Sequence, residues 1–337
     1  MIKFYSLSLF QRSLLFPLTK EKGLGLNGLD SIPQVERLPN DEEMQDLIQL
    51  TINGLLQGGI YSLISIGLTL IFGVTRIVNF AHGEFLMLAM YATFFLFQLA
   101  GIDPYLSLLI VTPLLFILGL CSERLVIHPI LNAPSFMQIF ATVGLSVALQ
   151  NAALFFWTAD YRSVKTAYAG MTIPAGDLLI SFARLMAFVA AVLISYGVFL
   201  YLKKTYAGRA IRAVAQNRTA ATLMGINIRR IYFFTFGLGS ALVGIAGALL
   251  MPIYYVFPTV GGLFVLTAFV VVVLGGLGNL TGAFFGGLII GLVESYSGFY
   301  VATQLKEAVY FVIFILVLLL KPSGLYGIVG AEEMGEK

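Results

Sequence analysis

The stretch IYFFTFGLGSALVGIAGALLMPIYYVFPTVGGLFVLTAFVVVVLGGLGNLTGAFFGGLIIGLV, residues 231–293, decides the fold class of this chain. Arg230 and Glu294 bound it, and no charged residue lies between them. A helix needs about 20 apolar residues to cross a hydrocarbon core of roughly 30 Å, so the stretch predicts two or three crossings. Its runs are continuous rather than alternating at every second residue, which favours helices over a β-barrel.

The whole composition agrees with a membrane protein. The chain has 337 residues, of which 59% are hydrophobic and 11% are charged, whereas a soluble domain carries about 25% charged residues. A net charge of +3 does not indicate a nucleic-acid partner, because in a membrane chain the placement of the charges matters more than their sum. The single cysteine, Cys121, and two histidines lie far apart in sequence and form no metal-binding pattern.

Reading the other charge-free runs in the same way predicts an all-α integral membrane protein. It is a polytopic bundle of about nine transmembrane helices, within a range of eight to ten. The predicted spans are 52–75, 83–102, 104–122, 134–157, 185–202, 231–254, 260–276, 280–298 and 304–320.

Charge placement predicts the orientation. The segment 203–230 holds seven of the chain's 20 basic residues and no acidic residue, so the positive-inside rule places it in the cytoplasm. Counting crossings from there puts the C-terminal tail, 328–337, on the same side. It puts the N-terminus and the loop 160–184 outside.

The chain divides into three parts by composition. Residues 1–43 are polar and turn-rich, and we interpret them either as an N-terminal extension or as residues that precede a true start at Met44. Residues 44–327 form the transmembrane domain, and residues 328–337 form a short tail.

A basic segment on the predicted inner side, Tyr206–Asn227, reads as two short helices. Asn217 is a favourable N-cap for the second helix, and Gly225 suits the left-handed residue that ends it. Ala220, Ala221 and Met224 then make a small apolar face among arginines. Such a face can seat in a cleft of a partner protein; alternatively, the loop lies on anionic lipid headgroups.

A second segment places Asn79, Phe80, His82 and Glu84 at the junction of two predicted spans. In a structural interpretation, Glu84 caps a helix start and Asn79 satisfies freed backbone groups. In a functional interpretation, the segment is a gate or a bend near the cytoplasmic mouth of a translocation path. An intramembrane enzyme using His82 and Glu84 is a third and weaker hypothesis.

The glycine-rich stretch around Gly276 and Asn279 permits either close helix packing or a broken helix that lines a cavity. Glu294 is the lone charge in its span. It faces the translocation path or reaches the outer interface.

Three motifs carry a resemblance to a known family. They are FGVTRIVNFAHGEFLMLAMY (72–91), GRAIRAVAQNRTAATLMGIN (208–227) and VVLGGLGNLTGAFFGGLIIGLVES (272–295). Together they resemble the permease subunits of high-affinity branched-chain amino acid ABC importers, from about Met44 to Gly327.

The resemblance implies an ABC importer permease fold in the bacterial inner membrane. It also implies a heterodimer with a second permease, two cytoplasmic ATPases and a periplasmic substrate-binding protein. The loop 208–227 would be the element that docks on an ATPase, and the residues that match it are Gly208, Arg209, Arg212, Asn217, Arg218, Ala220, Ala221, Met224 and Gly225.

The sequence contains no GxxxxGK[ST] phosphate loop, so ATP and Mg²⁺ are expected on partner subunits, and no cofactor or catalytic residue is expected on this chain. The expected substrates are leucine, isoleucine and valine. Urea, short amides and other amino acids remain alternatives within the family. A secondary carrier driven by protons or sodium is the alternative of a different class.

Overall fold

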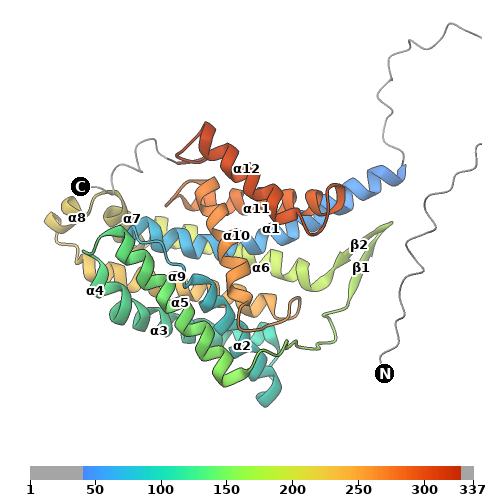
Figure 1. Ribbon diagram of the computed structural model, residues 1–337, viewed down its shortest axis with the longest axis horizontal. Coiled ribbons are helices and arrows are strands. Elements are labelled where there is room, and N and C mark those ends of the chain that lie inside the picture. The colour runs from blue at the N-terminus through green and yellow to red at the C-terminus, as the bar shows by residue number, and fades with distance from the viewer. Residues whose placement is uncertain (1–40, 328–337) are drawn as a thin grey trace, which may run out of the picture. The chain divides into compact units, whose positions relative to one another are not determined.

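The computed structural model describes residues 41–327, with side chains from Glu43 onward, and most of this part is helical. The expectations for residues 1–40 and for the tail 328–337 lie outside the described residues. The elements (Figure 1) are α1 (Asp41–Thr75), α2 (His82–Ala100), α3 (Pro104–Ser122), the π-helical turn η1 (Glu123–Ile127), α4 (His128–Ile130), α5 (Ser135–Trp157), β1 (Thr172–Ala175), β2 (Leu178–Ser181), α6 (Phe182–Lys204), α7 (Tyr206–Gln216), α8 (Arg218–Leu223), α9 (Ile228–Leu250), α10 (Val260–Gly275), α11 (Leu280–Tyr300) and α12 (Lys306–Leu320).

Each of the nine predicted spans falls on one of these helices, which confirms the polytopic helical bundle. In the described part of the chain, seven helices are long and apolar enough to cross a membrane. The other two, α10 and α12, have 16 and 15 residues. The third span was predicted to end at residue 122, but its helix continues through η1 and α4 to Ile130, for 27 residues in all.

The predicted outer loop contains the β-structure of the described chain, a hairpin that the all-α prediction did not include. Strands β1 and β2 pair antiparallel, with Ala175 opposite Leu178. Gly176, the first residue of the two-residue turn, has a φ of 66°, as a tight type II′ hairpin turn requires. The side chains of Gln45 and Gln49 donate to Asp177 Oδ2 and to the Leu179 carbonyl.

These bonds also explain why α1 extends beyond the predicted span 52–75. The helix has 35 residues, and at a rise of 1.5 Å per residue it is about 52 Å long, well over the thickness of a hydrocarbon core. Its first turns therefore reach the hairpin instead of ending at the membrane surface.

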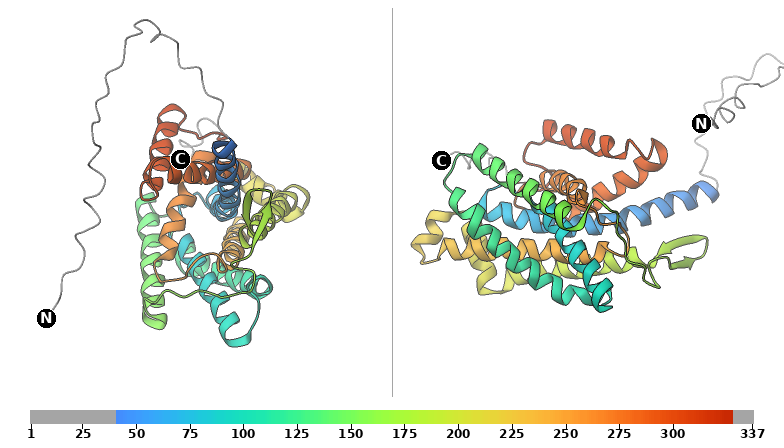
Figure 2. Two further views of the ribbon diagram at one scale, coloured as in Figure 1. Left: turned by 90° about the vertical axis from the view of Figure 1, so that its right-hand side faces the viewer. Right: turned by 60° about the horizontal axis from the view of Figure 1, so that its bottom comes forward.

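The two ends of the helical bundle differ in chemistry. Helices α7 and α8 lie at one end, and the hairpin β1–β2 lies at the opposite end, in Figure 1 and in the right-hand view of Figure 2. We call the first the basic end, after Lys203, Lys204, Arg209, Arg212, Arg218, Arg229 and Arg230. We call the second the hairpin end.

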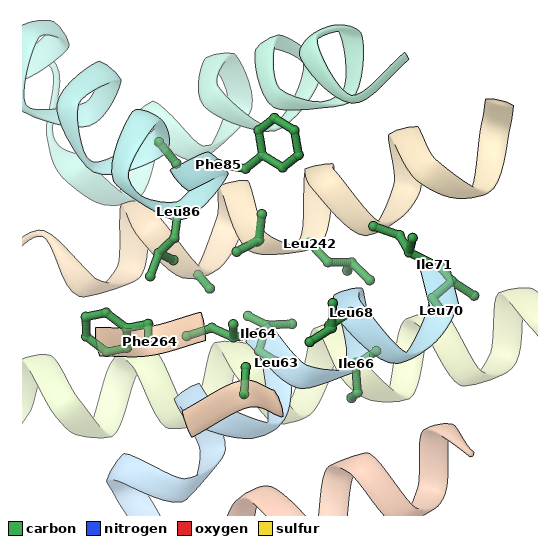
Figure 3. Packing of buried hydrophobic residues seen from close by; sticks show 14 of the residues in the cluster. Leu63, Ile64, Ile66, Leu68, Leu70, Ile71, Phe85, Leu86, Leu242 and Phe264 are labelled. Carbon is green, nitrogen blue, oxygen red and sulfur yellow. The ribbon is translucent and has the colours of Figure 1, made fainter. Parts of the chain in front are cut away.

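Helix α1 forms the centre of the bundle. Its apolar side chains, among them Leu63, Ile64 and Ile71, pack on Phe85 of α2 and Leu242 of α9 (Figure 3). A helix that is apolar on all sides is expected to be buried. Helix α1 fits this expectation, because 89% of an 18-residue apolar stretch of it is buried inside the protein.

Glycines let α11 approach α1 closely. A Cβ on Gly58 would lie 2.8 Å from the Gly287 carbonyl oxygen, and a Cβ on Gly291 would lie 2.4 Å from the carbonyl oxygen of Gly54. Small residues at such spacing bring two backbones together in a membrane. Gly275 and Gly282 meet in the same way where α10 turns into α11, which supports close packing as the reason for this glycine-rich stretch.

The bundle contains an inverted pair of three-helix units, α1–α2–α3 and α9–α10–α11. Helix α1 packs most extensively on α11, and α3 on α9, while α1 and α9 run antiparallel beside each other. Helices α2 and α10 meet at their first turns, where a Cβ on Gly83 would lie 2.1 Å from the Gly261 carbonyl oxygen. Repeats of opposite direction with helices that start inside the bundle are typical of membrane transporters.

Candidate functional site

The basic segment folds into the two short helices that its sequence predicts. The Asn217 side chain accepts a hydrogen bond of 2.9 Å from the Ala220 amide and caps α8. Gly225, with a φ of 79°, follows the end of the helix. The second helix, α8, ends at Leu223, and Met224 is its C-cap.

The exposed surface of α8 differs from the predicted face of Ala220, Ala221 and Met224. Ala221 is buried at 4% exposure, whereas Leu223 and Met224 are each 82% exposed. Ala221 therefore faces the bundle, and the exposed apolar pair at the tip of the basic end is Leu223 and Met224.

Helix α7 lies tightly against the end of α6. A Cβ on Gly208 would lie 2.4 Å from the Tyr201 carbonyl oxygen, and Ile211 and Val214 are buried. Arg209 is exposed, while Arg212 donates through Nε to the Leu202 carbonyl at 3.1 Å. The position of α7 is therefore fixed relative to α6.

Two arginines interlock the basic segment with the end of α1. Arg218 donates to the Thr75 carbonyl at 2.8 Å and to the Val74 carbonyl at 3.4 Å. In the opposite direction, Arg76 donates to the Ala215 carbonyl at 3.2 Å. The last carbonyls of a helix lack intrahelical partners and carry partial negative charge, so a guanidinium binds them favourably.

Arg76, the residue that follows α1, has an unusual charge environment and an unusual backbone conformation. Burial, and then the nearby positive charge of Arg218, lower the pKa of Arg76. Arg76 has a φ of 59°, a left-handed conformation that is uncommon outside glycine. Arg212 and Arg218, which the resemblance places in the loop that docks on an ATPase, bind carbonyls of this chain.

From Arg76 the chain turns back into the bundle before α2 begins. His82, the first residue of α2, places Nε2 at 3.1 Å from the Ile64 carbonyl oxygen. Ile64 and Thr75 are 11 positions apart on α1, which is about 16 Å along the helix axis. His82 and Glu84 are both fully buried. The junction thus leads from Arg76 at the basic end to His82 and Glu84 at depth within the bundle.

Hydrogen bonds hold this junction, residues 76–84, on several sides. Asn79 Oδ1 accepts from the Ala81 amide at 3.1 Å, so it satisfies the backbone as predicted. Thr142 of α5 donates to the Val78 carbonyl at 3.1 Å. The Phe80 ring stacks on Phe269 of α10, with centroids 6.1 Å apart.

Glu84 lies in the first turn of α2 but does not cap that helix through its side chain. Its Oε1 accepts from Gln150 at 2.7 Å and from Ser146 at 3.1 Å, both on α5. His82 instead binds α1. Among the described residues no hydrogen bond joins the two side chains, so the geometry does not favour a catalytic His82–Glu84 pair.

The other predicted path residues lie in two different places. Asn279 caps α11, accepting from the Gly282 amide at 3.0 Å, and donates to the Tyr326 carbonyl at 2.7 Å. Gly276, with a φ of 104°, packs beside Gly327. Glu294 lies far from both along α11 and binds Tyr61 and Lys306. Lys306 was missed from sequence, although it is the first charge after Glu294.

A cavity of about 530 Å³ opens beside the interlocked arginines. Its lining joins the end of α1, α7, the α10–α11 turn and the last described residues, and it includes Arg76, Lys203, Arg212, Asn279 and Tyr326. The basic end therefore has both a protruding tip and a cationic recess.

This architecture places the chain among polytopic membrane permeases, since transporters use helices that begin inside the bundle to hold polar groups at depth. More specifically, the chain belongs to the family described as branched-chain amino acid transport system / permease component, which matches residues 50–318. As a permease component it is a subunit of a transport system.

Curated relatives cover nearly the whole chain. The high-affinity branched-chain amino acid transport system permease protein BraD of Pseudomonas aeruginosa is 32% identical over 298 residues, covering 85% of this chain and 97% of BraD. LivH of Escherichia coli K12, a permease protein of the same description, is 31% identical over 302 residues, with the same coverage. A probable LivH of Methanocaldococcus jannaschii is 31% identical over 281 residues, covering 79% of this chain and 88% of the relative. No solved structure matches the chain.

Proposed function

We propose that this chain is the pore subunit of an ATP-driven importer that passes branched-chain amino acids through a bacterial inner membrane. The observation that carries the proposal is the interlock of Arg218 and Arg76, which joins the basic segment to the end of α1. A cytoplasmic ATPase that moves α7 and α8 would thereby move the junction that leads into α2.

The route of this coupling runs through hydrogen bonds at both ends of the junction and through the chain between them. Displacement of Arg218 acts on the Thr75 carbonyl, and the chain from Arg76 to Ala81 leads directly from there to His82. His82 and Glu84 in turn bind α1 and α5. A shift of the basic segment therefore alters the packing of α2 against its neighbours, about 16 Å away along α1.

The tip of α8 supplies the docking surface in this proposal. Leu223 and Met224 project from the basic end, and exposed apolar residues on a short helix fit a groove in a partner. Arg209, on α7, is also exposed at the basic end. We assign the basic end to the cytoplasm by the positive-inside rule, and the hairpin end to the periplasm.

The remaining subunits follow from the family. We propose a second permease chain, two ATPases that bind ATP and Mg²⁺, and a periplasmic protein that delivers the substrate. The relatives BraD and LivH are described as branched-chain amino acid permeases, which supports leucine, isoleucine and valine as the substrates over urea, amides or other amino acids.

The docking proposal is tested by Leu223→Asp combined with Met224→Asp. Two carboxylates on the tip oppose burial in an apolar groove, so we expect co-purification of the ATPase to fall at least tenfold and leucine uptake to be lost. The matched control is Met171→Asp at the hairpin end, where Met171 is 56% exposed. This variant should keep both ATPase co-purification and leucine uptake.

Normal ATPase assembly by the double variant would contradict the docking role of α8. Leucine uptake by vesicles that contain this permease without any ATPase would contradict the ATP-driven mechanism and favour an ion-coupled carrier.

A further inference from the structure

A second cavity, of about 190 Å³, lies on the hairpin side of the α2–α10 crossing. Aromatic side chains from α1, α10, α12 and the α9–α10 loop line it, including Tyr61, Tyr254, Phe264 and Tyr310. At about 30 Å³ per water molecule, its volume corresponds to roughly six waters. The volume is below the roughly 300–1,000 Å³ of typical drug-sized ligand pockets, which suits a single small amino acid.

The cavity carries an ion pair between Lys306 and Glu294. Lys306 Nζ lies 2.5 Å from Glu294 Oε1, and the Tyr61 hydroxyl donates to Glu294 Oε2 at 2.5 Å. The side chain of Lys306 is 35% exposed, and that of Glu294 is 12% exposed. The carboxylate thus faces the aromatic wall from deeper in the protein, while the ammonium is more accessible. Glu307 also lines the cavity and is exposed.

These groups retain hydrogen-bonding capacity. An ammonium has three donors and an ionised carboxylate has about four acceptor sites, whereas the bonds found use one donor of Lys306 and two sites of Glu294. A ligand that brings both a carboxylate and an ammonium can bind the pair without leaving either charge unpaired. A ligand with one charge alone cannot, which makes the pair a filter for zwitterions.

The walls suit an apolar side chain. The Tyr254 ring stands edge-on to Phe264, with centroids 5.5 Å apart, and Tyr61 lies 6.5 Å from the same ring. The hydroxyl of Tyr254 is engaged by Gln57 at 3.0 Å. The aromatic faces therefore form an apolar corner next to the charge pair.

The cavity opens at the hairpin end. Tyr161 and Tyr255, which also line it, are 69% and 60% exposed. Their neighbours Arg162 and Val256 pair through backbone hydrogen bonds of 3.0 and 2.8 Å. The α5–α6 and α9–α10 loops are thus joined at the mouth, on the side where we place the delivering protein.

We propose that this cavity is a substrate site that first receives a zwitterionic amino acid with an apolar side chain. The substrate carboxylate binds Lys306, its ammonium binds Glu294, and its side chain packs on Tyr61, Tyr254 and Phe264. The inference rests on the proposed transport of such amino acids. Because Lys306 and Glu294 already neutralise each other, a zwitterion gains little net charge attraction, so binding stays weak, as passage requires.

The test uses a reporter cysteine at Leu263, a residue that lines the cavity and is 54% exposed. In membranes carrying the full chain with Cys121→Ser and Leu263→Cys, labelling by an impermeant maleimide is timed with and without 10 mM ligand, a concentration on the order of that expected for weak sites. We expect leucine to slow labelling at least threefold. Leucinamide lacks the carboxylate and 4-methylpentanoate lacks the ammonium, so neither should protect.

Variants separate recognition from a structural ion pair. Lys306→Met should abolish protection by leucine, Lys306→Arg should retain it, and the matched control Lys321→Met near the basic end should leave it unchanged. Equal protection by all three ligands, protection in Lys306→Met, or no protection by leucine in the parent would each overturn the site.

The same assay distinguishes the site from the mechanism. The variant Leu223→Asp with Met224→Asp lacks the proposed ATPase docking surface but keeps the cavity, so leucine should still protect its reporter cysteine. Protection together with ATPase-independent uptake would reject the ATP-driven mechanism and retain the site. ATPase-dependent uptake without protection by leucine would reject the substrate site and retain the ATP-driven mechanism.

Discussion

The two helix junctions of the inverted repeat, α1–α2 and α9–α10, share a geometry and differ in chemistry. Both reverse the chain and start a helix whose first glycine packs against the other, Gly83 on Gly261. The α1–α2 junction is polar, with Asn79, His82 and Glu84 buried and hydrogen-bonded. The α9–α10 junction, residues 251–259, contains no ionisable carboxylate or basic group and is rich in aromatic residues.

The difference shows how two junctions with the same backbone arrangement can have different roles at the two ends of the bundle. The polar junction continues from the arginine interlock at the basic end, whereas the aromatic junction lines the cavity that opens at the hairpin end. In our proposal the first receives the motion and the second receives the substrate. Their contact at Gly83 and Gly261 links the two.

The largest effect is expected from breaking that contact. In Gly83→Val the added Cβ would overlap the Gly261 carbonyl oxygen, and because backbone atoms cannot yield, destabilisation should exceed the 1–3 kcal/mol that is typical of overpacking. We expect loss of monodisperse folded protein in fluorescence-detected size-exclusion chromatography. The control is Gly262→Val, where a Cβ meets nothing within 4 Å; equal losses in both variants would contradict the close crossing.

The next effect concerns the link to the basic end. In Arg218→Gln the charged hydrogen bonds to Thr75 and Val74 are weakened, and such bonds contribute about 1.5–3 kcal/mol each. We expect leucine uptake to fall roughly tenfold while the ATPase still co-purifies. Arg230→Gln, an exposed arginine at the start of α9, serves as the control with near-normal uptake. If Arg218→Gln transports normally, the interlock does not carry the motion.

A smaller effect is expected within the polar junction. Glu84→Ala leaves Gln150 and Ser146 without their acceptor, which should destabilise the protein by about 1–3 kcal/mol. Glu84→Gln keeps an acceptor oxygen and should recover most of that loss. Thermal-shift measurements in detergent compare the two, and an unchanged melting temperature in Glu84→Ala would show that α5 is not held through this carboxylate.

The smallest effect is expected in the aromatic junction. Tyr254→Phe removes one hydrogen bond, to Gln57, but preserves the ring that packs on Phe264, so we expect a loss of about 1 kcal/mol. The same thermal-shift assay measures it. A loss larger than that of Glu84→Ala would reverse our ranking of the two junctions.

Much of the architecture could be predicted from local sequence. Charge-free runs located all nine helices, because a hydrocarbon solvent demands long apolar segments. Asn217 and Gly225 predicted the ends of α8 correctly, because caps and left-handed residues depend on the immediate neighbours. The hairpin β1–β2 was missed, since its strands have only four residues each and its turn signal was read as loop.

The candidate site was predicted only in part. Asn79 was correctly expected to satisfy the backbone, but the depth of His82 depends on the return of the chain along α1, which no local pattern encodes. Ala221 and Met224 were grouped on one face, although helix packing turns Ala221 inward and leaves Met224 exposed.

The sequence by itself determined that this protein lies in a membrane, where its apolar helices fall along the chain and how its short helix α8 is capped, because these depend on interactions between residues close along the chain. Only the tertiary structure decided that Arg218 binds the end of α1, that Gly83 meets Gly261 and that Glu294 pairs with Lys306 across α11 and α12. The physical reason is that such contacts depend on the relative placement of whole helices, which close packing at glycines fixes.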